Sequence, residues 1–111
     1  MSELKDMLQK QMKDLDDLRE EEGRYGSKLA SARAFGGYMA TRDISAAKGG
    51  GQRVSALLEK EQKAWDAFEE ERSYGTKDSA ARAYGAYLAI RNARERAGEL
   101  ARQRAAQKKK K

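Results

Sequence analysis

The chain has 111 residues, which is enough for one small domain. It carries 24 basic and 18 acidic side chains, for a formal net charge of +6, and it has no proline, cysteine or histidine. The missing cysteine and histidine exclude a disulfide framework and a thiolate metal site, and they remove the commonest general base.

The spacing of apolar residues predicts an all-α fold with four helices. The first helix is expected over about residues 3–22, where Leu4, Leu8, Leu15 and Leu18 lie near one face. Gly23 and Gly26 then bracket a turn. A second helix is expected over about 28–47, with Ser27 as its N-cap, because a serine side chain can accept a hydrogen bond from the first free backbone N–H groups.

The third helix is expected over about 53–72 and the fourth over about 77–107. Thr76 is the expected N-cap of the fourth helix. Between the second and third helices, Gly49, Gly50 and Gly51 predict a flexible joint.

One segment is written twice. Residues 25–42 read YGSKLASARAFGGYMATR and residues 74–91 read YGTKDSAARAYGAYLAIR, with 10 of 18 aligned positions identical at an offset of 49. An internal repeat of this kind predicts two copies of one supersecondary unit.

The repeat predicts two αα-hairpins in tandem. The first hairpin covers 1–48, a Gly-rich hinge covers 49–52, the second hairpin covers 53–101, and a basic tail covers 102–111. The two hairpins either close into a four-helix bundle or splay apart on the hinge and pack on neighbouring chains.

Small residues recur every fourth position in both copies. Because a glycine inside a helix costs about 1 kcal/mol relative to alanine, its presence there indicates a close backbone approach. We therefore expect the second and fourth helices to cross through these faces. The expected contact residues are Ala32, Gly36, Ala40, Ala81, Gly85 and Ala89.

Charge alternates along the chain. Net charge is −4 over residues 1–22, +4 over 23–52, −2 over 53–72 and +8 over 73–111, so each hairpin pairs an acidic helix with a basic one. The last ten residues carry +6, which equals the net charge of the whole chain. This pattern predicts charge pairing within each hairpin and a separate cationic tail.

Basic side chains in the repeat form a possible repeated surface, and aromatic residues are interleaved with them. Such a surface can stack bases and bind phosphates. Alternatively, Phe35 and Tyr84 fill the interior of the bundle. Arg33 and Arg82 could then pair with the acidic clusters at 20–22 and 69–71, or those clusters could bind an external basic partner. The basic residues are Lys28, Arg33, Arg42, Lys77, Arg82 and Arg91.

The tail is the strongest indication of a partner. A cationic segment neutralises phosphates without reading bases, so it predicts a nucleic acid, with an acidic protein surface as the alternative. The residues expected to make this contact are Arg102, Arg104, Lys108, Lys109, Lys110 and Lys111.

Catalytic and metal-binding patterns are not visible in the sequence, so we expect no enzyme, no cofactor, no metal and no small-molecule substrate.

Leu, Ile, Val and Phe number only 14 residues, which is few for the core of a domain of this length. This favours an oligomer or a structural subunit of a larger complex, such as a virion or ribonucleoprotein component, over a lean monomeric bundle. A small regulatory inhibitor or adaptor, binding a basic protein surface through its acidic helices, is the alternative. The first residues lack the apolar stretch of a secretion signal, which favours an intracellular location, cytoplasmic or within an assembled particle.

Overall fold

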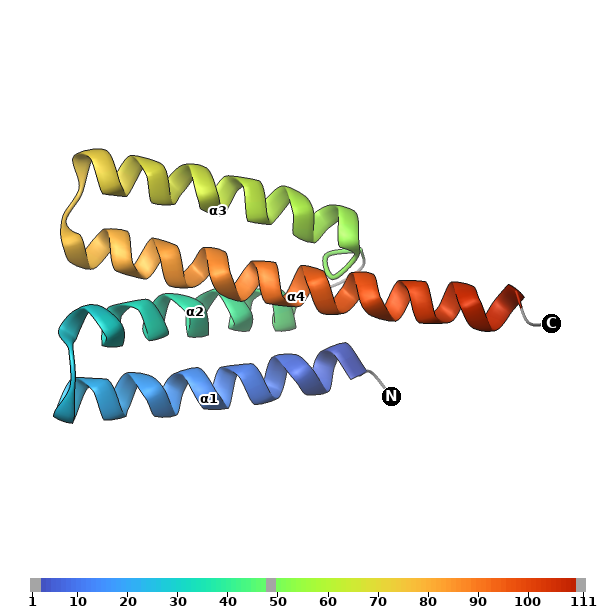
Figure 1. The fold of residues 1–111 in the computed structure, drawn as a ribbon, viewed down its shortest axis with the longest axis horizontal. Coiled ribbons are helices and arrows are strands. Elements are labelled where there is room, and N and C mark those ends of the chain that lie inside the picture. Colours follow the sequence, from blue (N-terminus) through green and yellow to red (C-terminus); the bar gives the residue numbers. More distant parts are fainter. Residues whose placement is uncertain (1–2, 48–49, 110–111) are drawn as a thin grey trace.

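The computed structural model describes residues 3–47 and 50–109, and within these ranges it contains four α-helices and no strand (Figure 1). They are α1 (Glu3–Tyr25), α2 (Lys28–Ala46), α3 (Val54–Tyr74) and α4 (Lys77–Lys109). The prediction of an all-helical class with four helices is confirmed.

The helix ends lie within three residues of the expected ones. The largest difference is at α1, which continues through Gly23 to Tyr25 rather than ending near residue 22. A Cβ at Gly23 would meet only Ser31 Oγ, at 3.6 Å, so the local packing does not require a turn there. α4 continues to Lys109, two residues beyond its expected end. Lys48 of the expected first hairpin, Gly49 of the expected hinge, and Lys110 and Lys111 of the expected tail lie outside the described residues.

Side chains cap the start of α2 and of α4 as expected. Ser27 Oγ accepts hydrogen bonds from the N–H groups of Leu29 and Ala30 at 3.1 and 3.4 Å. Thr76 Oγ1 accepts from Ser79 N at 3.0 Å, and Ser79 Oγ accepts from Thr76 N at 3.0 Å. Both turns therefore satisfy backbone donors that have no partner within the helix.

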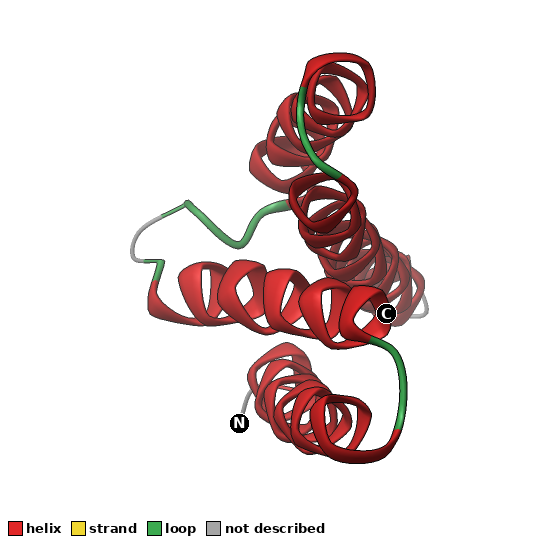
Figure 2. Ribbon diagram, turned by 90° about the vertical axis from the view of Figure 1, so that its left-hand side faces the viewer, coloured by secondary structure: helices red, strands yellow, loops and turns green. Residues whose placement is uncertain are grey.

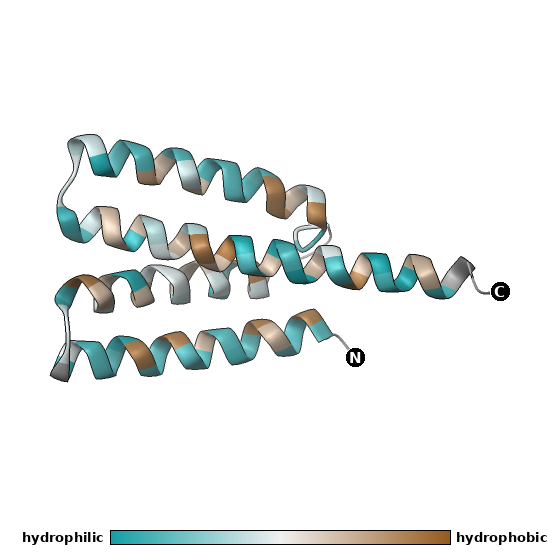
Figure 3. Ribbon diagram, viewed as in Figure 1, coloured by the Kyte–Doolittle hydropathy of each residue, from teal (hydrophilic) through white to brown (hydrophobic). Residues whose placement is uncertain are grey.

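The four helices lie side by side in the order α1, α2, α4, α3. α1 packs on α2 and touches α4, whereas α3 packs on α4 alone among the described residues. Figure 2 shows α2 and α4 in the middle of the molecule, with α1 and α3 on the two outer sides. The two middle helices form the most extensive contact, and in Figure 3 much of α2 and the first half of α4 is pale because these stretches are rich in Gly, Ala, Ser and Tyr.

Two glycines allow α2 and α4 to cross with their backbones in contact. A Cβ added to Gly36 would collide with the carbonyl oxygen of Arg82, and one added to Gly85 would collide with the carbonyl oxygen of Arg33. Gly36 and Gly85 are equivalent in the repeat, as are Arg33 and Arg82, so the two contacts are related by a local two-fold axis. The crossing therefore depends on the absence of a side chain at both glycines.

The apolar core lies at the end of the crossing where α1 starts, α2 ends and α3 starts. Its most buried large side chains are Leu8, Ile44 and Leu57. Thr41 is fully buried among them, where its hydroxyl donates to Gly37 O at 2.7 Å and accepts from Gln11 Nε2 at 2.8 Å. A buried hydroxyl with both bonds made costs little stability.

We predict that Gly85→Ala lowers the free energy of unfolding by about 3 kcal/mol, because a backbone carbonyl must move to admit the methyl group. Gly98→Ala, in the same helix, is the matched control. A Cβ at Gly98 meets only Arg102 Nη1, at 3.6 Å, so this change should raise stability by about 0.5–1 kcal/mol. Urea unfolding followed by circular dichroism measures both, and equal effects of the two substitutions would contradict the close crossing.

Candidate functional site

The small residues expected at the crossing lie on the facing sides of α2 and α4. Gly36, Ala40, Gly85 and Ala89 are buried, and Ala32 and Ala81 are partly buried towards the ends. These residues form the contact between the two helices, and they fix the positions of the helices that carry the candidate functional residues.

The basic residues of the expected repeated surface are all exposed. Arg33 and Lys77 line a hollow that also contains Phe68 and Tyr84. Arg82, the repeat partner of Arg33, lines a different groove. Arg91 pairs with Glu95 on its own helix at 3.9 Å. Lys28 and Arg42 line neither of these hollows, and the repeated surface stays a prediction.

Among the described residues, contacts between aromatic rings lie within α3 and α4 and between these two helices. Trp65 lies 5.4 Å from Phe68 and 5.0 Å from Tyr87 between ring centroids, and Phe68 lies 5.1 Å from Tyr84. These tilted rings bury apolar area and favour one relative orientation of the two helices. Trp65 is nevertheless 36% exposed, so the cluster both holds the two helices together and contributes to the surface.

The equivalent positions of the first hairpin hold a charged pair. Arg19 Nη2 lies 2.7 Å from Asp16 Oδ1, and its guanidinium sits over the ring of Phe35 at 5.5 Å. Asp16 and Arg19 are the repeat partners of Trp65 and Phe68. The two hairpins thus share a backbone arrangement but present different chemistry on their outer sides.

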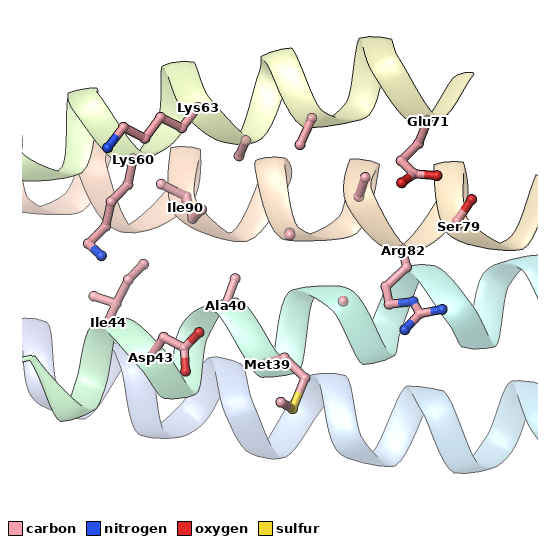
Figure 4. A pocket seen from close by; sticks show the side chains of 15 residues that line it. Met39, Ala40, Asp43, Ile44, Lys60, Lys63, Glu71, Ser79, Arg82 and Ile90 are labelled. Atoms are coloured by element: carbon pink, nitrogen blue, oxygen red, sulfur yellow. The ribbon is translucent and has the colours of Figure 1, made fainter. Parts of the chain in front are cut away.

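The largest hollow is a groove between α2 and α3, with α4 as its floor (Figure 4). Its volume is about 680 Å³. The floor and walls are mainly small or aliphatic, including Ala40, Ile44, Ala64, Ala83 and Ile90. We call this the α2–α3 groove.

A counterpart of this groove lies between α1 and α4 over α2, and it is nearly filled. Its volume is about 180 Å³, and its lining residues map onto those of the α2–α3 groove through the 49-residue offset. Leu15 and Leu18 stand where α3 has Ala64 and Ala67. The two leucines of α1 occupy space that the two alanines of α3 leave open.

Gln11 completes the filling of the smaller groove. Its Nε2 donates to Thr41 Oγ1 at 2.8 Å and to Ala89 O at 3.4 Å, which ties α1 to both middle helices. The repeat partner of Gln11 is Lys60, an exposed side chain whose charge favours water, and the repeat partner of Thr41 is Ile90, which has no hydroxyl to accept a hydrogen bond. α3 therefore lacks the bridge that holds α1 to the far helix.

Sequence reasoning missed this difference between the grooves because it aligned only the second and fourth helices. The same offset applied to the first and third helices pairs Gln11 with Lys60, Leu15 with Ala64 and Leu18 with Ala67. Loss of two leucines on one copy alone is the signal that would have indicated an open groove.

Charged side chains stand at both ends of the α2–α3 groove. Figure 4 shows Lys60, Lys63 and Asp43 towards one end and Glu71 and Arg82 towards the other. Lys63 lies 3.9 Å from Glu59 in an ion pair that is well exposed to solvent. The groove is thus apolar along its length and carries both signs of charge at its rim.

The acidic clusters do not pair with Arg33 or Arg82 in the described structure. Glu22 instead bends over the turn, and its Oε2 accepts from Ser27 N at 3.0 Å, at the start of α2. A carboxylate is favourable at a helix N-terminus, which explains why an acid at the end of α1 needs no external basic partner. Glu69 pairs with Arg72 on its own helix at 3.6 Å.

One charged pair links α3 to α4. Arg94 donates from Nε to Glu61 Oε1 at 2.7 Å and from Nη2 to Glu61 Oε2 at 3.2 Å. The side chains are 28% and 16% exposed, so water screens this pair less than the others. The hydrogen bond to Glu61 raises the pKa of Arg94, against the opposing effect of burial.

The basic end of α4 lies apart from the crossing. Leu100 is its last buried residue, and residues 101–107, which include Arg102 and Arg104, are all exposed. In Figure 1 this stretch runs past the ends of the other helices. Lys108 and Lys109 continue the helix.

Metal-ligand clusters of three or more acidic, histidine or cysteine residues do not occur in the part of the chain that the structure describes. None of the helices in these residues has an apolar stretch long enough to cross a bilayer. Comparison of the chain with protein-family models, with curated proteins and with solved structures finds no match.

We predict that Glu61→Gln lowers the free energy of unfolding by about 1–2 kcal/mol, because Arg94 would keep its charge and lose its charged acceptor. Glu59→Gln is the matched control, since its ion pair with Lys63 is exposed and should contribute at most about 0.5 kcal/mol. Chemical unfolding of both variants checks this, and similar losses would contradict a special role for the Arg94 pair.

Proposed function

We propose that this chain is a noncatalytic structural subunit of a larger assembly, built from two repeated helical hairpins on a Gly-rich hinge at 49–52. Its basic C-terminal segment contacts an anionic partner, for which we propose a nucleic acid. The observation that carries the proposal is the exposed, cationic end of α4, which leaves the packed body after Leu100.

Charge supports this assignment. Residues 102–111 contain two arginines, four lysines and no acidic residue. α4 continues into this segment as far as Lys109, so Arg102 and Arg104 are carried on a helix. A cationic segment of this kind neutralises phosphates by counterion release and does so without sequence preference.

The sparse core supports the assembly part of the proposal. α3 packs on α4 alone and keeps Leu58 at 48% exposure and Trp65 at 36%. The open α2–α3 groove adds further apolar surface next to it. Apolar surface left uncovered in this way is characteristic of protein–protein contact.

One side chain of the linker reaches the end of α2. Gln52 Nε2 donates to the last carbonyls of α2, at 3.1 Å to Ile44 O and 3.4 Å to Ser45 O. Within the linker, Arg53 N donates to Gly50 O at 3.0 Å. These bonds would limit the range of the proposed hinge.

We predict that the chain retards short duplex DNA or RNA, with an affinity that falls by about a thousandfold between 50 and 200 mM salt if six phosphates are neutralised. Replacing the six tail cations with glutamine should abolish this binding. The measurement is an electrophoretic or anisotropy titration over a range of salt concentrations.

The chain offers a matched control for this experiment. Replacing the six cations of the repeated surface with glutamine removes the same charge from the body; these are Lys28, Arg33, Arg42, Lys77, Arg82 and Arg91. Binding that survives the tail replacement but fails after the body replacement would contradict the proposed role of α4 and favour the repeated surface.

A further inference from the structure

The α2–α3 groove is open, whereas its counterpart in the other copy of the repeat is nearly filled by side chains of α1. We propose that a second copy of this chain docks in the open groove, and that the two copies pair through antiparallel α3 helices about a two-fold axis. The inference rests on the proposed role as an assembly subunit but not on the nucleic-acid contact.

The face of α3 that lines the groove is complementary in charge to the same face of a second, antiparallel α3. Lys60, Ala64, Ala67 and Glu71 line the groove at spacings of four, three and four residues, which places them on one helix face. Lys60 and Glu71 lie equally far from the midpoint between the two alanines. In an antiparallel pair centred on that midpoint, each Lys60 faces the Glu71 of the other copy, and each Ala64 faces an Ala67.

Lys60 and Glu71 are available for contact between copies. Eleven residues separate them, which is about 16 Å along a helix, so they do not pair within one chain. In the described part of the structure, neither takes part in an ion pair. Figure 4 places them towards opposite ends of the groove.

The alanines permit the close approach that such a pair requires. Ala64 is partly buried and Ala67 is exposed, and neither has atoms beyond Cβ to hold the helices apart. Helices with small residues at the contact pack at the short end of the usual range, about 8 Å between axes. Ile44 and Ile90, on the α2 wall and the α4 floor, would then be covered by the arriving α3.

The rim charges select this occupant over a foreign helix. Both ends of the groove carry both signs of charge, so a uniformly acidic or basic partner would be repelled somewhere along it. A second α3 satisfies Lys60 and Glu71 together. α1 cannot pair in the same way, because its equivalent residues are Gln11, Leu15, Leu18 and Glu22, which include no cation to face the carboxylate.

Charge exchange tests the arrangement. Sedimentation equilibrium of the full chain at low salt should show a reversible dimer. Lys60→Glu and Glu71→Lys should each raise its dissociation constant by about tenfold to a hundredfold, since two attractive contacts become repulsive in each case. The double variant K60E/E71K should restore wild-type affinity. Lys10→Glu, an exposed change of the same charge on α1, is the control and should have no effect.

Cysteine pairing locates the contact, because the natural chain has no cysteine. A mixture of the Lys60→Cys and Glu71→Cys chains should form a mixed disulfide dimer under oxidation. Either variant alone should not, because identical positions lie about 16 Å apart across the axis.

Several outcomes would overturn the proposal. A chain that stays monomeric up to about 0.1 mM assigns the groove to a different partner or to none. A dimer insensitive to both single substitutions, or a double variant as weak as the single ones, assigns dimerisation to another surface.

The dimer and the nucleic-acid contact can fail separately. Replacing the tail cations should leave the dimer mass unchanged while nucleic-acid binding is lost. Lys60→Glu should reduce the dimer while the monomer still binds through α4, with the salt dependence of each monomer unchanged.

Discussion

The fold depends on the contact between the backbones of α2 and α4. At two positions a carbonyl oxygen rests where any other residue would place a Cβ, and both positions are glycine. Close contact of this kind brings many weakly attractive atoms together without large side chains. It explains how a chain with 14 large aliphatic and phenylalanine residues forms ordered helices, because alanine and glycine supply the centre of the packing.

The outer helices show how the two copies have diverged around that centre. α1 covers its side of the crossing with two leucines and a glutamine that reaches α4. α3 covers its side with alanines and lysines, and it is held instead by an aromatic cluster and the Arg94–Glu61 pair. One copy is therefore closed against its neighbour, and the other is held only from one side.

Much of this structure could be predicted from the sequence. Helix spacing indicated the four helices, and hydroxyl caps placed the starts of α2 and α4, since these are local properties of a few residues. The repeated Gly36 and Gly85 indicated where backbones approach. The predicted end of α1 was less accurate than the predicted helix starts, because Gly23 lies on a side of the helix where no contact enforces a turn.

The candidate sites were harder to predict, because they depend on distances between helices. Arg33 and Arg82 are equivalent in sequence, and the two-fold axis places them in counterpart grooves on opposite sides of the crossing, of which one is nearly filled and the other is open. Glu22 appeared misplaced at a helix end until the turn brought it to the start of the next helix. The open groove follows from two leucine-to-alanine differences whose effect depends on which helix lies opposite.

The reciprocity of the crossing has a consequence for the origin of the two halves. At the crossing, α2 and α4 present equivalent glycines and carbonyl oxygens to each other, so this contact has the symmetry of a homodimer interface within one chain. The linker raises the effective concentration of one half for the other and adds no contact of its own to the crossing. Once the halves are joined, selection can alter α1 and α3 independently, whereas in a true homodimer every substitution would appear on both sides.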